Sequence, residues 1–285
     1  MKTIQKTAIA LAASGLFATA AFAQTAPAAA PEAPEASPLT ANVTVVSDYR
    51  YRGISQSNFK PAIQGGFDYA HESGFYIGNW NSSISWISDA APATANTRVT
   101  APIEMDFYGG IKKEFIGEGF ASDFGVLQYY YPTSGLNVSG TQANPNTTEL
   151  YAAQNFTFGA VTGFVKFSYS VSPIFGFANS TGSYYPDLTV NYDTGVWGLA
   201  LNAHVGYQYV AGNVQGSPTG ASNSSLYSYT DWKLGVTKDF GGGLSLSAAY
   251  IGTDAGKTGS VYNYSSPTGK NLGGSTGIVA LTKTF

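Results

Sequence analysis

The residues of this sequence that could do chemistry are acids and bases placed at alternate positions of short segments. Asp48, Arg50 and Arg52 form one such set, and Glu104 and Asp106 form another. Alternate side chains of a β-strand point to the same face, so each set shares one face. Opposed acids and bases around a water-filled bore create a field that selects among ions. The complete set with this predicted placement is Asp48, Arg50, Arg52, Glu104, Asp106, Lys112, Lys166, Asp187, His204, Asp231 and Lys233.

A second interpretation of the same side chains is that they pair with one another and fill a narrow interior. Charged side chains are costly in hydrocarbon, so under either interpretation they must face away from lipid. Barrels with few strands are filled by side chains, whereas large ones enclose an aqueous channel. The sequence leaves both interpretations open.

The elements that would position these side chains are β-strands of about ten residues. In Leu199–Val210, a face of leucine, valine and tyrosine alternates with a face that is mostly small or polar. Ten residues of such alternation is the length that a tilted strand needs to cross a bilayer. The pattern recurs along the chain, for example in Ala41–Arg52 and Phe75–Ile87, and predicts about 12 strands.

The predicted connections between these strands alternate in length. Five short turns are expected near residues 72, 118, 161, 194 and 242, and six longer loops near residues 57, 95, 140, 178, 218 and 263. Outer-membrane barrels combine short periplasmic turns with longer extracellular loops, whereas a sandwich or propeller has no reason to do so. The predicted fold class is therefore all-β, a transmembrane antiparallel β-barrel with both chain ends on the short-turn side.

Tyrosine and tryptophan side chains on the apolar faces are predicted to form girdles at the membrane interfaces. A rival role is a track of stacked rings that guides sugars, but the strand phase favours lipid. The predicted girdle consists of Tyr49, Tyr51, Tyr76, Trp80, Trp86, Tyr207, Tyr209 and Trp232. The final residue, Phe285, resembles the C-terminal signal by which barrel-assembly machinery recognises its clients.

The first 39 residues are predicted to lie outside the barrel. Lys2 and Lys6 precede an apolar run that ends in a small-x-small site at Ala21–Ala23, which is typical of a secretory signal peptide. Residues 24–39 are rich in Ala, Pro and Glu and are predicted to form a disordered tether. The predicted organisation is a signal peptide over 1–23, a tether over 24–39 and an outer-membrane barrel over 40–285.

The composition fits this organisation. Of the 285 residues only 11% are charged, none is cysteine, and the mean hydropathy is −0.04, so apolar residues are interleaved with polar ones. The formal net charge is −3 and no basic cluster occurs, so nucleic acid is not an expected partner. The expected partners are outer-membrane lipid, the barrel-assembly machinery and small solutes.

The segment Val46–Trp80, which contains SDYRYRGISQS, resembles the TorF family of proteobacterial porins, as does the C-terminal Ile278–Phe285. The resemblance covers the whole predicted barrel. It implies an outer-membrane β-barrel with a pore role. It supplies no catalytic residues and no substrate.

The predicted function is a porin-like channel for passive diffusion of small polar or charged solutes across the outer membrane. The alternative is a closed barrel that acts as a structural or adhesion scaffold through its extracellular loops. An enzyme is not expected: Gly273–Gly277 matches G-x-S-x-G but precedes a strand and not a helix, and a hydrolase is the weakest hypothesis. No cofactor or metal is predicted.

Overall fold

The computed structural model describes residues 37–90, 99–136, 144–214, 216 and 220–285. The predicted signal peptide and all but the last three residues of the predicted tether lie outside the described residues. Two short helices occur in the described ranges, α1 (Trp86–Ala90) and α2 (Asn223–Tyr227), and neither is long and apolar enough to cross a membrane.

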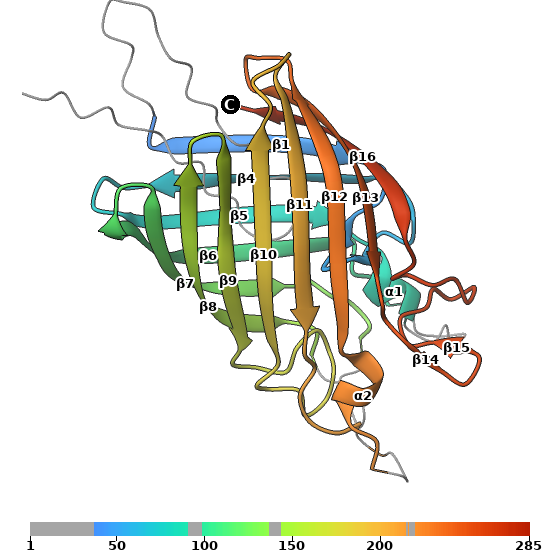
Figure 1. The fold of residues 1–285 in the computed structure, drawn as a ribbon. Coiled ribbons are helices and arrows are strands. Elements are labelled where there is room, and N and C mark those ends of the chain that lie inside the picture. The colour runs from blue at the N-terminus through green and yellow to red at the C-terminus, as the bar shows by residue number, and fades with distance from the viewer. Residues whose placement is uncertain (1–36, 91–98, 137–143, 215, 217–219) are drawn as a thin grey trace, which may run out of the picture.

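The described chain forms one closed antiparallel barrel of 12 strands (Figure 1). Each strand pairs with its neighbour in sequence, and β1 closes the ring because Val45 pairs with Ile63 of β4 and with Leu281 of β16. The predicted fold class and strand number are therefore confirmed. The wall strands are β1 (Leu39–Val46), β4 (Ala62–Ala70), β5 (Phe75–Ser83), β6 (Ile103–Gly117), β7 (Phe120–Tyr130), β8 (Thr147–Phe158), β9 (Val161–Ser170), β10 (Tyr184–Asp193), β11 (Leu199–Gln208), β12 (Tyr229–Asp239), β13 (Leu244–Thr253) and β16 (Thr276–Thr284).

The wall turns apolar side chains outward and polar or small ones inward. In β13, Leu244, Leu246 and Tyr250 are exposed on the outside, whereas Ser245 and Ser247 are buried inside. The same alternation holds over Leu199–Gln208 of β11, as its sequence predicts. This inside-out distribution is the arrangement that a barrel needs in lipid.

The connections differ in length at the two ends of the barrel. One end carries short turns, such as the turn after β12, where Gly243 adopts φ +79°. An added Cβ at Gly243 would lie 2.3 Å from the carbonyl oxygen of Thr284, so this tight turn requires glycine. The other end carries the six longer connections, in agreement with the sequence. Both ends of the barrel segment meet on the short-turn side, where Ala41 and Phe285 exchange backbone hydrogen bonds.

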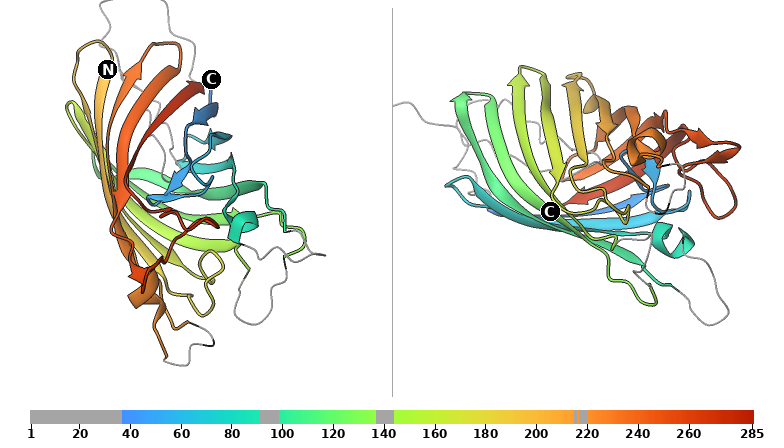
Figure 2. Two further views of the ribbon diagram at one scale, coloured as in Figure 1. Left: turned by 90° about the vertical axis from the view of Figure 1, so that its right-hand side faces the viewer. Right: turned by 90° about the horizontal axis from the view of Figure 1, so that it is seen from below.

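The first predicted strand, Ala41–Arg52, is wrong in its second half. The chain leaves the wall after Val46 and returns at Ala62, and the intervening residues 47–61 fold into the barrel (Figure 2). We call residues 47–61 the inner hairpin. Its strands are β2 (Arg50–Tyr51) and β3 (Ile54–Ser55), joined by Arg52 and Gly53 with φ values of +45° and +76°. Two left-handed residues at a two-residue turn are typical of a tight hairpin.

Two further short strands, β14 (Lys257–Thr258) and β15 (Val261–Tyr262), form an exposed hairpin in the last long loop. The predicted strand Phe75–Ile87 also ends early, because the wall strand stops at Ser83 and α1 begins at Trp86.

Candidate functional site: the barrel interior

The inner hairpin crosses the lumen from the wall where the barrel closes to the wall opposite. It leaves from β1 and β4, and Arg52 at its tip reaches Glu149 on β8 and Gln208 on β11. The Arg52 guanidinium carbon lies 4.1 Å from the ring centroid of Tyr185 on β10. Because β10 lies about halfway round the ring from β1 and β4, the inner hairpin with Arg52 at its tip spans the bore.

Arg52 and Glu149 form a buried, two-pronged ion pair. Arg52 Nη2 donates to both Glu149 oxygens at 2.8 and 3.0 Å, and Arg52 Nη1 donates to Gln208 Oε1. A single nitrogen thus contacts both carboxylate oxygens, and hydrogen bonds between charged groups are among the stronger ones in proteins. The pair fixes the tip of the inner hairpin.

Asp48 and Arg50 hold the base of the same hairpin. Arg50 Nε donates to Asp48 Oδ2 at 2.6 Å, and Ser55 Oγ and Ser57 Oγ donate to the other Asp48 oxygen. Arg50 Nη1 donates to the carbonyl oxygens of Gly53, Leu272 and Gly274, and so joins the inner hairpin to the last long loop. These local bonds favour a folded-in loop over a continued strand.

Tyr49 and Tyr51 face the interior, so their predicted place in a lipid girdle is wrong. Tyr49 is 1% exposed and donates to Glu104, and the Tyr51 hydroxyl bonds to that of Tyr129. Tyr131 donates to the second Glu104 oxygen at 2.7 Å. Once the chain leaves the wall, its alternate faces no longer separate lipid from lumen.

The girdle prediction also fails for the aromatic residues near β5. Tyr76 is 3% exposed and lies inside, Trp80 packs edge-on against Tyr49 inside, and Trp86 belongs to α1. The outward face of β5 carries Asn79 and Asn81 instead, and Asn79 Nδ2 donates to the backbone carbonyl of Asp106 at 2.9 Å. Because their side-chain NH2 groups find acceptors nearby, these asparagines can occupy the outer face. The inward and outward faces of β5 are therefore the reverse of those expected from the sequence.

Three girdle residues do point outward. Tyr207 is 38% exposed beside outward-facing Val205, Trp232 pairs with Val205 in the neighbouring strand, and Tyr209 stacks on Tyr184 at 4.7 Å. Their action at a membrane interface stays a prediction.

Five charged residues on the wall itself stand in one row of the sheet register. Lys112 pairs with Asp123, the row passes through Ala153 to Lys166 and Asp187, and it then passes through Gly206 to Asp231. We call Lys112, Asp123, Lys166, Asp187 and Asp231 the charged row. All five side chains face the interior, and their signs alternate over the first four.

The charged row is linked by tyrosine and histidine side chains. Tyr76 donates to Asp123 and bonds to Tyr151, whose ring lies 4.3 Å from Lys166 Nζ. At the other end, His204 Nε2 lies 3.0 Å from Asp231 Oδ2, and Tyr185 donates to the second oxygen of Asp231. The row therefore continues as a polar band around more than half of the interior. Lys233 also lies on the inward face of β12, next to His204 in the register.

Glu104 and Asp106 lie on the inward face of β6 and are completely buried. Glu104 is held by two tyrosines, whereas neither carboxylate oxygen of Asp106 has a hydrogen-bond partner among the described residues. All 11 charged residues predicted for the lumen thus lie inside the barrel, but Asp48, Arg50 and Arg52 reach it from the inner hairpin and not from a wall strand.

Sequence reasoning missed several interior residues. Asp123 lies on β7, where the run Tyr129–Tyr131 places tyrosine on both faces. Glu149 lies on β8, whose sequence does not alternate clearly between apolar and polar residues. Gln208 lies on the small or polar face of Leu199–Val210, but nothing in the local sequence indicates that it bonds to Arg52. Asp123, Gly125, Leu127 and Tyr129 occupy every second position of β7 and so share one face. This spacing is the signal that could have identified Asp123 as an interior residue.

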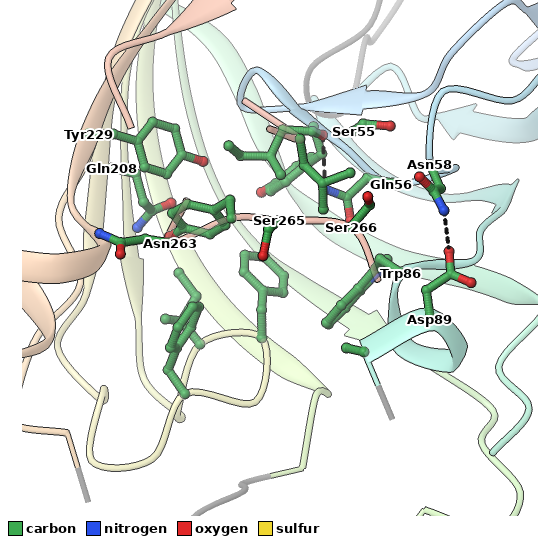
Figure 3. Close-up of a pocket in the computed structure, with 18 of the residues that line it drawn as sticks. Ser55, Gln56, Asn58, Trp86, Asp89, Gln208, Tyr229, Asn263, Ser265 and Ser266 are labelled. Atoms are coloured by element: carbon green, nitrogen blue, oxygen red, sulfur yellow. Dashed lines mark hydrogen bonds between the residues drawn. The ribbon is translucent and has the colours of Figure 1, made fainter. Parts of the chain in front are cut away.

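A pocket of about 210 Å³ lies between the inner hairpin and the long loops (Figure 3). Tyr51 and Gln56 of the hairpin form one side, and Trp86 of α1, Phe177 and Tyr229 contribute other sides. Most of its wall is aromatic or aliphatic. It is therefore different in chemistry from the charged row.

The histidines and the G-x-S-x-G match of the sequence lie apart in the structure. No cluster of three or more His, Asp or Glu side chains in these ranges could hold a metal ion. Ser275 of the G-x-S-x-G match lies just before β16. His204 makes its hydrogen bonds to Tyr185, Thr189 and Asp231 on the inner wall. His71 lies in a short turn at the other end of the barrel.

Comparisons with known proteins agree with the fold. A family model described as "Bacterial protein of unknown function (Gcw_chp)" matches residues 28–285. No curated protein matches the sequence. A solved KdgM porin has a TM-score of 0.50 at 6% identity and covers 86% of this chain and 99% of its own. The COG4313 outer membrane channel from Pseudomonas putida F1 has a TM-score of 0.50 at 13% identity, with coverage of 92% and 100%. At these identities the likeness is one of fold.

Proposed function

This chain belongs to the bacterial family of unknown function Gcw_chp, and we propose that it is an outer-membrane channel for passive diffusion of small polar or charged solutes. The observation that carries the proposal is a closed wall with an apolar outside and a charged row inside. A scaffold needs the apolar outside but has no need for charges along its interior. The barrel folds of the KdgM porin and the COG4313 channel support the same proposal.

The inner hairpin sets the width of this channel. It crosses the bore, its base is braced by the internal Asp48–Arg50 pair and its tip is tied to β8 by the Arg52–Glu149 pair, so solutes must pass beside it or displace it. The lumen residues of the charged row then act on solutes that have passed the hairpin.

Several finer assignments are part of the proposal. Residues 1–23 act as a cleaved signal peptide, residues 24–39 as a periplasmic tether, and residues 40–285 as the barrel. Phe285 serves as the assembly signal, and Tyr207, Tyr209 and Trp232 serve as membrane-interface anchors. The resemblance of Val46–Trp80 to the TorF family reflects kinship, and since this segment includes the inner hairpin, we expect that family to share it.

The alternative function, a closed scaffold that acts through its long loops, is favoured by one observation. The Arg52–Glu149 pair joins the hairpin to the far wall, which is how a permanently plugged barrel would be built. The channel and the scaffold therefore differ in whether the hairpin leaves a path for solutes.

Conductance of the purified barrel in planar bilayers separates the two. Val46 pairs directly with Ala62, so residues 47–61 can be replaced by an Asn-Gly turn that keeps the wall intact. We expect small steps from the natural chain and steps several-fold larger from the shortened one. A matched control that shortens the exposed β14–β15 hairpin should conduct like the natural chain. If the natural chain folds but never conducts, the channel proposal fails and the scaffold takes its place.

A further inference from the structure

We propose that the pocket between the inner hairpin and the long loops is a binding site for a neutral saccharide of one or two rings. This inference deepens the proposed channel function and rests on it, because the pocket lies at the long-loop mouth, where solutes from outside would arrive. Three features of the pocket support it: aromatic walls, hydrogen-bonding groups that lack partners, and an almost uncharged lining.

The walls of the pocket are aromatic rings that brace one another. Tyr51 meets Phe175 edge-on at 5.5 Å, and Tyr264 meets Tyr229 at 5.2 Å and Phe177 at 6.3 Å. Rings fixed by such contacts form a wall that is already shaped before a ligand arrives. Aromatic faces pack well against the C–H faces of a sugar ring, because both surfaces are flat and apolar.

Polar groups without partners supply the second feature. Among the described residues the Tyr229 hydroxyl makes no hydrogen bond, although Tyr229 is only 5% exposed, and Figure 3 shows it directed into the pocket. The indole Nε1 of Trp86 is buried and also lacks a partner there. Gln56 uses Nε2 to bond the carbonyl oxygen of Ile54, which leaves its Oε1 unbonded. A buried group such as Trp86 Nε1 is costly to leave unsatisfied, and a ligand rich in hydroxyls could bond to it and to the other two groups.

The charge of the lining supplies the third feature. Asp89 is the one acidic or basic side chain among the pocket residues that the structure describes. Its Oδ2 already accepts hydrogen bonds from Ser85 Oγ at 2.7 Å and from Asn58 Nδ2 at 3.2 Å. An anionic ligand would lose its water here and meet only a carboxylate of its own sign, which is unfavourable. A neutral ligand pays no such cost.

The volume sets the size of the ligand. A pocket of about 210 Å³ holds roughly seven waters at about 30 Å³ each. One or two sugar rings would replace such a cluster of waters. Longer chains would have to extend from the pocket into the open mouth.

Binding can be measured on the whole folded barrel in detergent by calorimetry, independently of conductance. We expect glucose and maltose to bind saturably, and galacturonic acid at neutral pH to bind at least tenfold more weakly because it carries a carboxylate. Tyr229→Phe should weaken maltose binding about tenfold, since it removes one hydroxyl and keeps the ring. The matched control Tyr207→Phe removes a hydroxyl from the outer face and should bind maltose like the natural chain.

Tryptophan fluorescence places the ligand. Maltose should change the emission of the natural chain and leave that of Trp86→Phe unchanged, because the other tryptophans, Trp80, Trp197 and Trp232, do not line the pocket. Absence of saturable sugar binding in a barrel that conducts would overturn the saccharide site and leave the channel. Equal binding of galacturonic acid, or full affinity in Tyr229→Phe, would also overturn it. Sugar binding without conductance would retain the site and end the channel proposal.

Discussion

The inner hairpin and the charged row use the same residue types in opposite ways. In the hairpin, Arg50 and Arg52 are buried and each meets a carboxylate within 2.8 Å, so their charges hold the fold together. In the row, Lys112 and Lys166 stand on wall strands, remain partly exposed and have no carboxylate within ion-pair distance in the described ranges. The strands already position the row, so its charges remain available to solutes.

The charges of the hairpin are therefore structural, whereas those of the row can act on passing ions. Alanine at both Arg50 and Arg52 would, from the sequence, be expected to shift ion preference toward cations. Because each arginine is paired, its removal instead frees the hairpin. The change in ion preference should come from the lysines of the row, and four substitutions test this division.

The largest effect is expected for Arg52→Ala. It leaves Glu149 buried without its cation, and loss of one partner of a buried pair costs about 3–5 kcal/mol. Denaturant unfolding of the barrel in vesicles measures the loss, and noisier, larger conductance steps should accompany it. Arg52→Met with Glu149→Leu removes both charges and should be less destabilised than the single variant. If the double variant is as unstable as the single one, the ion pair is not what holds the tip.

The next largest effect is expected for Gly53→Ala. Gly53 adopts φ +76°, and its added Cβ would lie 2.4 Å from Thr253 Cγ2 on β13. Backbone strain from a non-glycine residue in this left-handed conformation costs about 1–3 kcal/mol. The close contact would also push the tip of the hairpin out of its position. Limited proteolysis should cut residues 47–61 faster than in the natural chain. Gly259→Ala, at φ +61° with no atom within 4 Å, is the matched control and should leave the cleavage of this segment unchanged.

A moderate effect on selectivity is expected for Lys166→Ala. A unit charge contributes on the order of 1 kcal/mol to an ion about 4 Å away in water, or roughly fivefold in relative permeability. The reversal potential in a salt gradient should move toward cations while the unfolding midpoint changes little. Lys238→Ala, whose Nζ bonds to the carbonyl oxygen of Trp197 in a short turn, should leave the reversal potential in place. An unmoved potential in Lys166→Ala would remove the row from ion selection.

The smallest effect is expected for Tyr207→Phe on the outer face. The Tyr207 hydroxyl makes no hydrogen bond within the described structure, so its removal should change the free energy of unfolding by less than about 0.5 kcal/mol. Conductance should equal that of the natural chain. A large change in conductance would mean that outer-face residues influence the bore, contrary to the division proposed above.

The interior could be predicted from the sequence over most of the wall, though not on β5, β7 and β8. Lys112, Lys166, Asp187, His204, Asp231 and Lys233 lie inside because strand alternation fixes their side. Asp123 and Glu149 were missed because tyrosines occupy both faces nearby. On β5 the inward and outward faces are the reverse of those predicted, because the side-chain NH2 groups of Asn79 and Asn81 find local acceptors on the outside while Tyr76 bonds to Asp123 inside.

The sequence by itself determined the strand number, the alternation of short and long connections and the inward side of most charges, because these follow from a period of two and from turn residues. Only the tertiary structure decided that residues 47–61 leave the wall. Asp48–Arg52 alternates like a strand, and the partners that draw it inward, Glu149, Gln208 and Leu272, are far away in the chain. A local pattern carries no information about such distant partners, so the contents of the bore are set by the closed barrel.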